Sequence, residues 1–223
     1  MSAAPAIDLP DLYRRVTRRY DGGSRFARGY VYWKLRTDPV HAAILDLAAG
    51  EDLGDVVDIG CGHGQLGIAL LEAGLARSVL GLDVIARHLE GAARAAAGLP
   101  FRTQLQDLAA QSRVPSGDTV MIIDVLHTLT TDAQAGLLAE AARAARERIL
   151  VRTLDPDRGA RSRLTRGMER LSRRFWPNAG RHVNPMPLSW MASRLEPEGF
   201  ATESVPCWQG TPFASMLLVA RRP

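Results

Sequence analysis

The strongest chemical signal in this sequence is a glycine-rich segment that follows a short apolar run. Residues 58–64 read DIGCGHG, with glycine at alternate positions. Glycines there let the backbone turn sharply and approach a ligand closely. The next apolar run ends at Asp83, where a carboxylate can accept hydrogen bonds from both ribose hydroxyls of a nucleoside. The two features together predict a site for a nucleoside-containing ligand.

Two classes of cofactor fit this pattern. Gly62, Gly64 and Gly67 have the spacing of a dinucleotide-binding fingerprint. That site aims a helix N-terminus at a pyrophosphate, and the carboxylate of Asp58, two residues before Gly60, would repel it. A carboxylate suits the ammonium group of S-adenosylmethionine, which carries no phosphate. The sequence therefore favours the methyl donor, and a tight strand-to-helix turn without a ligand stays as the alternative.

The segment 58–64 resembles motif I of the class I S-adenosylmethionine-dependent methyltransferases, in particular the small-molecule type. Asp83 matches the ribose-binding acid of that family, and the segment 106–108 resembles the motif whose acid binds the adenine amino group. The segment 124–127 resembles the D-V-L-H segment of small-molecule methyltransferases. The resemblance implies cofactor contacts from Asp58, Gly60, Cys61, Gly62, Gly64, Asp83, Val84, Asp107, Leu108, Asp124 and Val125.

His127 is the candidate acid–base residue. Histidine titrates near neutrality and can take a proton from an acceptor hydroxyl during attack. A histidine at this point of the motif can also serve only in packing, and that alternative stays open. No cluster of histidine, cysteine or acidic residues has the spacing of a metal site, so we expect no metal.

Apolar runs, read as strands, alternate along the sequence with helix-forming stretches, and these elements position the candidate residues. Helices between strands favour right-handed crossovers and a parallel sheet. The expected strands are 56–59, 78–82, 101–106, 119–123, 148–153, 202–207 and 213–220. The expected helices are 9–20, one opened by Asp38-Pro39 and closed by Gly50, 66–73, 86–97, 133–146 and 187–195. Only a loop separates the last two strands, which predicts that they pair antiparallel.

We therefore expect an α/β fold with a Rossmann-like, seven-stranded, mostly parallel sheet, helices on both faces and an antiparallel last strand. Residues 1–38 are predicted to form a helical N-terminal lid. Residues 39–223 are predicted to form the methyltransferase domain, with a basic cap inserted at about 155–186.

The positive charge is concentrated in one region. The chain has 28 basic and 24 acidic residues, and 12 arginines lie between positions 143 and 181. The cap is either a solvated surface or a landing site for an acidic carrier protein that presents the acceptor. An RNA methyltransferase is the alternative, but few aromatic residues are interleaved with the arginines as stacking platforms, so nucleic acid is the less favoured partner.

Composition excludes several other classes. With 46% hydrophobic and 23% charged residues, the chain is neither disordered nor fibrous. No apolar run reaches the roughly 18 residues of a membrane span, and the N-terminus lacks the order of a signal peptide. Two cysteines cannot make a disulfide framework. We therefore expect a cytoplasmic protein.

The predicted function is methyl transfer from S-adenosylmethionine to oxygen or carbon of a small organic acceptor. A protein that binds S-adenosylmethionine without catalysing transfer is a further alternative, which turnover with any acceptor would exclude.

Overall fold

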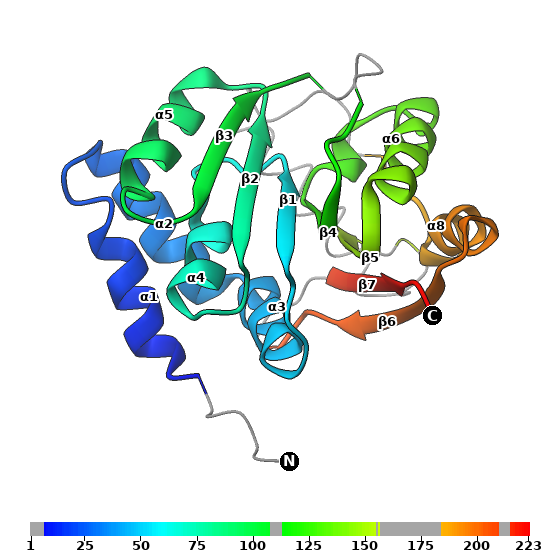
Figure 1. The fold of residues 1–223 in the computed structure, drawn as a ribbon, viewed down its shortest axis with the longest axis horizontal. Helices are drawn as coiled ribbons and strands as arrows, with labels where there is room; N and C mark the ends of the chain where they lie inside the picture. Colours follow the sequence, from blue (N-terminus) through cyan, green and yellow to red (C-terminus); the bar gives the residue numbers. More distant parts are fainter. Residues whose placement is uncertain (1–6, 108–112, 155, 157–183, 210–214) are drawn as a thin grey trace. The chain divides into compact units, whose positions relative to one another are not determined.

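The computed structural model describes residues 7–107, 113–154, 156, 184–209 and 215–223. Three helices come first, and strands and helices then alternate (Figure 1). The helices are α1 (Leu9–Arg18), α2 (Arg25–Thr37), α3 (Pro39–Gly50), α4 (Gln65–Glu72), α5 (Ala86–Ala95), α6 (Thr131–Ala144) and α8 (Leu188–Leu195), with 3₁₀ turns η2 (Leu126–Thr128) and η3 (Glu196–Glu198). The strands are β1 (Asp55–Ile59), β2 (Ser78–Asp83), β3 (Phe101–Leu105), β4 (Gly117–Ile123), β5 (Ala145–Leu154), β6 (Ala201–Pro206) and β7 (Ser215–Arg221).

The strands form one seven-stranded sheet in the order β3-β2-β1-β4-β5-β7-β6. β1 pairs with β2 and β2 with β3 in parallel, whereas β7 pairs antiparallel with both β5 and β6. The strand order reverses between β1 and β4, the kind of point at which open α/β sheets bind ligands. The predicted Rossmann-like fold with an antiparallel last strand is confirmed.

Contacts divide the chain into two compact units. The first contains residues 1–107 and 117–121, and the second contains 108–116 and 122–223. No helix in the described ranges has the length and apolar character that a membrane crossing requires.

The first unit is built around the buried strands β1 and β2. All residues of β1 after Asp55 are buried, as expected of a parallel strand covered on both faces. In this register Asp58 lies opposite Gly81, and Ile59 lies opposite Leu82. A Cβ atom at Gly81 would lie 2.7 Å from the Cys61 sulfur. Glycine at position 81 therefore lets the glycine-rich loop after β1 approach β2 closely.

The N-terminal helices pack onto the first unit. α1 contacts α2 and α4, and α3 contacts α4 (Figure 1). The guanidinium group of Arg19, just after α1, pairs with Glu72 at 2.5 Å and donates to the carbonyls of Ala95 and Ala97. Asp38 caps α3 by accepting from Val40 N at 3.2 Å, as the Asp-Pro pair predicts. These contacts hold α1 against the helices that follow β1 and β2.

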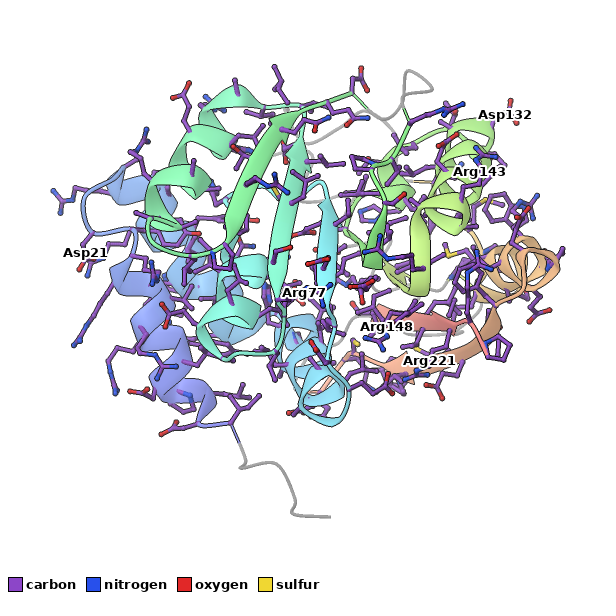
Figure 2. The ribbon with its side chains drawn as sticks, viewed as in Figure 1. Asp21, Arg77, Asp132, Arg143, Arg148 and Arg221 are labelled. Atoms are coloured by element: carbon purple, nitrogen blue, oxygen red, sulfur yellow. The ribbon has the colours of Figure 1, made fainter. Side chains whose placement is uncertain are left out.

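The second unit contains the antiparallel strands. Six of the seven residues of β7 are buried, and Arg221 at its end lies opposite Arg148 of β5. Figure 2 shows these two arginines side by side. α6 and α8 pack against each other, and α8 also contacts β6 and β7. The apolar faces of these helices therefore cover the antiparallel part of the sheet.

The predicted boundaries of α6 and β5 are wrong. α6 begins at Thr131 rather than 133, because the Thr130 side chain caps it by accepting from Ala133 N at 3.3 Å. The backbone becomes extended at Ala145, so β5 begins there and includes Arg146, which we had assigned to the helix. Most of the predicted basic cap, residues 157–183, lies outside the described residues.

Candidate functional site

The glycine-rich loop leaves β1 through three residues in the left-handed region. Gly60, Gly62 and Gly64 have φ values of 72°, 55° and 75°. The amides of Gly60 and Cys61 donate to the Leu82 carbonyl at 2.7 and 3.0 Å, which ties the loop to β2. Gly64 is also the N-cap residue of α4. The backbone thus passes from strand to helix in one tight turn that residues with side chains rarely adopt.

Asp83, the last residue of β2, connects this loop to the next helix. Its Oδ2 accepts from Gly62 N at 2.9 Å, and its Oδ1 accepts from Ile85 N at 2.8 Å. His88 Nδ1 lies 3.9 Å from Oδ1. A carboxylate has about four acceptor positions, so Asp83 can still accept from a ligand.

Asp58 is only 3% exposed and lies in the apolar strand before the loop. Burial, and to a lesser extent the charge of Asp83, raises its pKa from 3.8 to about 7. A positively charged ligand group beside it would favour the carboxylate form and lower this pKa again. The site is therefore suited to a cation on electrostatic grounds.

The thiol of Cys61 is also buried in the loop. Burial and the charges of Asp58 and Asp83 raise its pKa, which keeps the sulfur protonated. A protonated thiol is a weak nucleophile, and contact of Cys61 with the cofactor stays a prediction. The other cysteine, Cys207, is buried as well.

The end of β3 lies next to Asp83. Leu105 pairs with Asp83 in the sheet register, and Gln106 N donates to the Asp83 carbonyl at 3.0 Å. Asp107 follows two residues after Leu105 and is exposed. Val84 and Leu105 are 60% and 62% exposed, an unusual position for large apolar side chains. Val84 is among the predicted cofactor contacts and Leu105 is not, and the predicted contact Leu108 lies outside the described residues.

The N-terminal helices contact the glycine-rich loop through His63. Tyr20 donates its hydroxyl hydrogen to the His63 carbonyl at 2.6 Å. The His63 ring lies 5.3 Å from the Tyr30 ring and 4.5 Å from the His88 ring, measured between centroids. Burial and the nearby His88 lower the pKa of His63. The Tyr20 contact joins positions 43 residues apart, and no local sequence signal indicates it.

The remaining predicted site residues lie in the second unit. Asp124, directly after β4, has a φ of 64° and forms an ion pair with Arg152. Arg152 also donates to the Ser215 hydroxyl at 2.9 Å, so Asp124 belongs to a polar network on β5 and β7. Val125 precedes the short η2 turn that holds His127.

The backbone of His127 is tied to a segment far along the chain. Asn184 N donates to the His127 carbonyl at 2.7 Å, and the Asn184 carbonyl accepts from Gln134 at 2.7 Å. The structure thus brings Asn184 to His127 in one unit, and Asp58, the loop and Asp83 together in the other. In the ranges that the structure describes, no group of three or more His, Cys, Asp or Glu residues could hold a metal ion.

Comparison with known proteins gives one match to a family model. A family model described as a methyltransferase domain matches residues 56–148, which includes the loop, Asp83 and Asp124. No curated protein matches the chain significantly.

Among solved structures, the chain is similar to magnesium protoporphyrin IX methyltransferase from Synechocystis PCC 6803 with bound S-adenosylhomocysteine. The identity is 24%, the TM-score is 0.65, and the match covers 95% of this chain and 94% of that one. N-methyltransferase NodS from Bradyrhizobium japonicum WM9 is 17% identical, with a TM-score of 0.62 and coverage of 95% and 98%. An O-methyltransferase family protein from Burkholderia thailandensis is 18% identical, with a TM-score of 0.64 and coverage of 94% and 61%.

Proposed function

We propose that this chain, whose residues 56–148 match a methyltransferase domain model, uses S-adenosylmethionine to methylate oxygen or carbon of a small organic acceptor. The observation that carries the proposal is the hydrogen bond from Gly62 to Asp83, which places a carboxylate directly beside the glycine-rich loop. A small acceptor is supported by the similarity to structures whose names describe an N-methyltransferase and a magnesium protoporphyrin IX methyltransferase.

The residues around the loop fit S-adenosylmethionine. Asp83 has acceptor capacity left for ribose hydroxyls, and Asp58 favours a cationic group. Val84 and Leu105 offer exposed apolar surface for the adenine ring, and Asp107 follows them with a carboxylate for its amino group. The carboxylate of Asp58, in the strand before the loop, would repel the pyrophosphate of a dinucleotide, which argues against the alternative cofactor.

S-adenosylmethionine supplies an electrophilic methyl group on a sulfonium sulfur. The work of the protein is to align the acceptor nucleophile with that methyl group and to keep water out. Orientation of this kind can contribute several kcal/mol, up to about 7–11 kcal/mol in the best cases. The loop contributes to alignment because its backbone is held to β2 and to the hydroxyl of Tyr20.

His127 is our candidate for the general base. A base is needed only if the acceptor nucleophile carries a proton. The backbone hydrogen bond from Asn184 limits the movement of the η2 turn, which favours a fixed position for the imidazole. Asp124 and Val125, just before this turn, remain proposed cofactor contacts.

A test of cofactor binding compares Asp83→Asn with Asp132→Asn. Asp132 lies in the first turn of α6, in the other unit, so its replacement removes the same charge without touching the loop (Figure 2). A hydrogen bond to a charged group contributes about 1.5–3 kcal/mol, so we expect Asp83→Asn to weaken S-adenosylhomocysteine binding at least about tenfold. Calorimetry with both variants measures this.

Equal affinities in the two variants would remove the ribose assignment of Asp83. Binding of NADH in place of S-adenosylhomocysteine would overturn the proposed function. Wild-type protein that binds S-adenosylhomocysteine but methylates none of a broad panel of small acceptors would favour the non-catalytic alternative, and methylation of RNA would favour the nucleic-acid alternative.

A further inference from the structure

A cavity of about 480 Å³ lies in the first unit, beside the glycine-rich loop but away from its carboxylates. Tyr20 comes from the segment between α1 and α2, and Phe26 comes from the first turn of α2. The loop contributes His63, and α5 contributes Arg87, His88 and Arg94. Neither Asp58 nor Asp83 is among its lining residues. The volume falls in the range of small-molecule sites, about 300–1,000 Å³.

The lining is strongly basic. Arg87, Gly91 and Arg94 follow one another at helical spacing on one face of α5. Both arginines are exposed, and the charge of Arg87 helps to lower the pKa of His63, so Arg87 acts on that ring. Glu90 is the one acidic side chain that lines the cavity. A site of this composition attracts an anion.

The opposite wall is aromatic. Phe26 lines the cavity and is 70% exposed, so its ring offers a free face. Gly91 leaves room between α5 and the loop, since a Cβ atom there would meet only His63 Nδ1, at 3.9 Å. An apolar ring can therefore lie against Phe26 while an anionic group faces α5.

A second observation concerns the two histidines that line the cavity. The Nδ1 atoms of His63 and His88 are buried and have no hydrogen-bond partner among the described residues. Buried polar atoms without a partner are rare, and each calls for an explanation. A ligand that reorients either ring would satisfy them.

We propose that this cavity binds a small organic anion, a carboxylate or phosphate carried on an apolar ring, at a site separate from that of S-adenosylmethionine. Arg87 and Arg94 bind the anionic group, Phe26 packs against the ring, and the two imidazoles separate the ligand from Asp83. His88 connects the two sites, because its Nδ1 lies 3.9 Å from Asp83 Oδ1. The proposal concerns binding alone and does not depend on methyl transfer.

The experiment uses the full chain and three probes of similar size: benzoate, phenyl phosphate and the neutral benzyl alcohol. Ligand-observed NMR or calorimetry measures their affinities. We expect at least one of the two anions to bind, and the stronger one identifies whether the site prefers a carboxylate or a phosphate. Benzyl alcohol is expected to bind at least about tenfold more weakly.

Two double variants with the same change in net charge then locate the site. R87E/R94E reverses the two cavity arginines, and we expect it to weaken anion binding at least about tenfold. R14E/R143E reverses two arginines outside the cavity, each paired with an acid on its own helix, and should leave probe affinity unchanged. Phe26→Ala should weaken phenyl phosphate binding more than binding of inorganic phosphate.

The proposal is wrong if none of the probes binds, if the anions and benzyl alcohol bind equally, or if both double variants behave alike. Displacement of the anion by saturating S-adenosylhomocysteine would also overturn it, because the cavity would then belong to the cofactor site. Since S-adenosylhomocysteine binding is measured separately, failure of the proposed function does not affect this result.

Discussion

At the scale of single residues, the carboxyl group of Asp58 makes folding depend on pH. Its pKa is about 7 in the folded chain, compared with the ordinary value of 3.8 that we take for the unfolded chain, because burial disfavours the charged form. The folded state therefore retains a proton that the unfolded chain releases between these two pH values. The stability that this group contributes is fully present below about pH 3.8 and is lost as the pH rises to about 7.

We expect Asp58→Asn to remove this dependence, because the amide stays neutral at every pH. Raising the pH from 5 to 7 should destabilise the wild type relative to the variant, by up to about 1.4 kcal/mol per pH unit. Urea unfolding of both proteins at pH 5, 7 and 8 measures the difference. Parallel curves for the two proteins would show that Asp58 ionises normally in the folded chain.

The same group predicts how cofactor affinity varies with pH. A cationic ligand group favours the ionised form of Asp58. Below pH 7 the carboxyl group must lose its proton when the ligand binds, and the free energy of that deprotonation weakens the binding. We expect wild-type affinity for S-adenosylmethionine to rise from pH 5.5 to about 7 and then level off. Calorimetry over this range should show a flat profile for Asp58→Asn. A wild-type profile as flat as that of the variant would contradict a role for Asp58 beside the cation.

His127 gives a prediction that separates catalysis from packing. If it is the general base, His127→Ala should lower kcat by roughly 10²–10⁴ and leave S-adenosylhomocysteine affinity nearly unchanged. Steady-state kinetics with an accepted substrate measures kcat, and thermal unfolding measures the stability of the variant. An unchanged kcat together with reduced stability would assign the residue to packing of the η2 turn.

At the scale of elements, the start of α4 depends on Gly64. Its φ is 75°, and a Cβ atom there would lie 3.0 Å from both Ala92 and Phe101. We expect Gly64→Ala to destabilise the protein by about 1–3 kcal/mol, from backbone strain and crowding. Gly136 in α6 is the matched control, because nothing lies within 4 Å of a Cβ atom there.

Gly136→Ala should stabilise the protein by roughly 0.5–1 kcal/mol, since alanine loses less backbone entropy in a helix. Denaturant unfolding of the two variants thus should give shifts of opposite sign. Shifts of the same sign would show that the left-handed turn before α4 is not a constraint on stability.

Elements were predictable from the sequence where the pattern is local. The apolar run of β1, the alternate glycines and the acid that ends β2 are each visible within a few residues, and the structure has them where expected. The boundary between α6 and β5 was missed, because alanine and arginine suit a helix equally well on both sides of Ala145. Contacts between distant segments, such as Tyr20 with His63, leave no periodic signal. They depend on tertiary packing, which a single sequence does not display.

At the scale of the whole molecule, the distribution of arginine predicts a response to salt. Most of the basic cap lies outside the described residues, and its role as a landing site for an acidic carrier protein is a proposal from the sequence. Screening weakens attraction between surface charges, so we expect turnover of a carrier-bound acceptor to fall as salt is raised from 50 to 500 mM.

Charge reversal of Arg163, Arg166 and Arg170 to glutamate should lower the same rate at low salt and leave S-adenosylhomocysteine binding intact. Association kinetics measured by stopped flow give the rate, and calorimetry gives the control. Turnover that is indifferent to both salt and the triple reversal would leave the cap as a solvated surface.

The close approach of the glycine-rich loop to β2 also has an evolutionary consequence. A Cβ atom at Gly81 would lie 2.7 Å from the Cys61 sulfur, so the two positions share one small volume. Which residues are tolerated at one of these positions therefore depends on the residue at the other. A lineage that acquires alanine at position 81 needs a smaller residue at position 61, and also a small shift of the Phe101 ring, which would lie 3.1 Å from the new Cβ atom. Among descendants of this sequence, the two positions should covary, with their summed side-chain volume more constant than either volume alone.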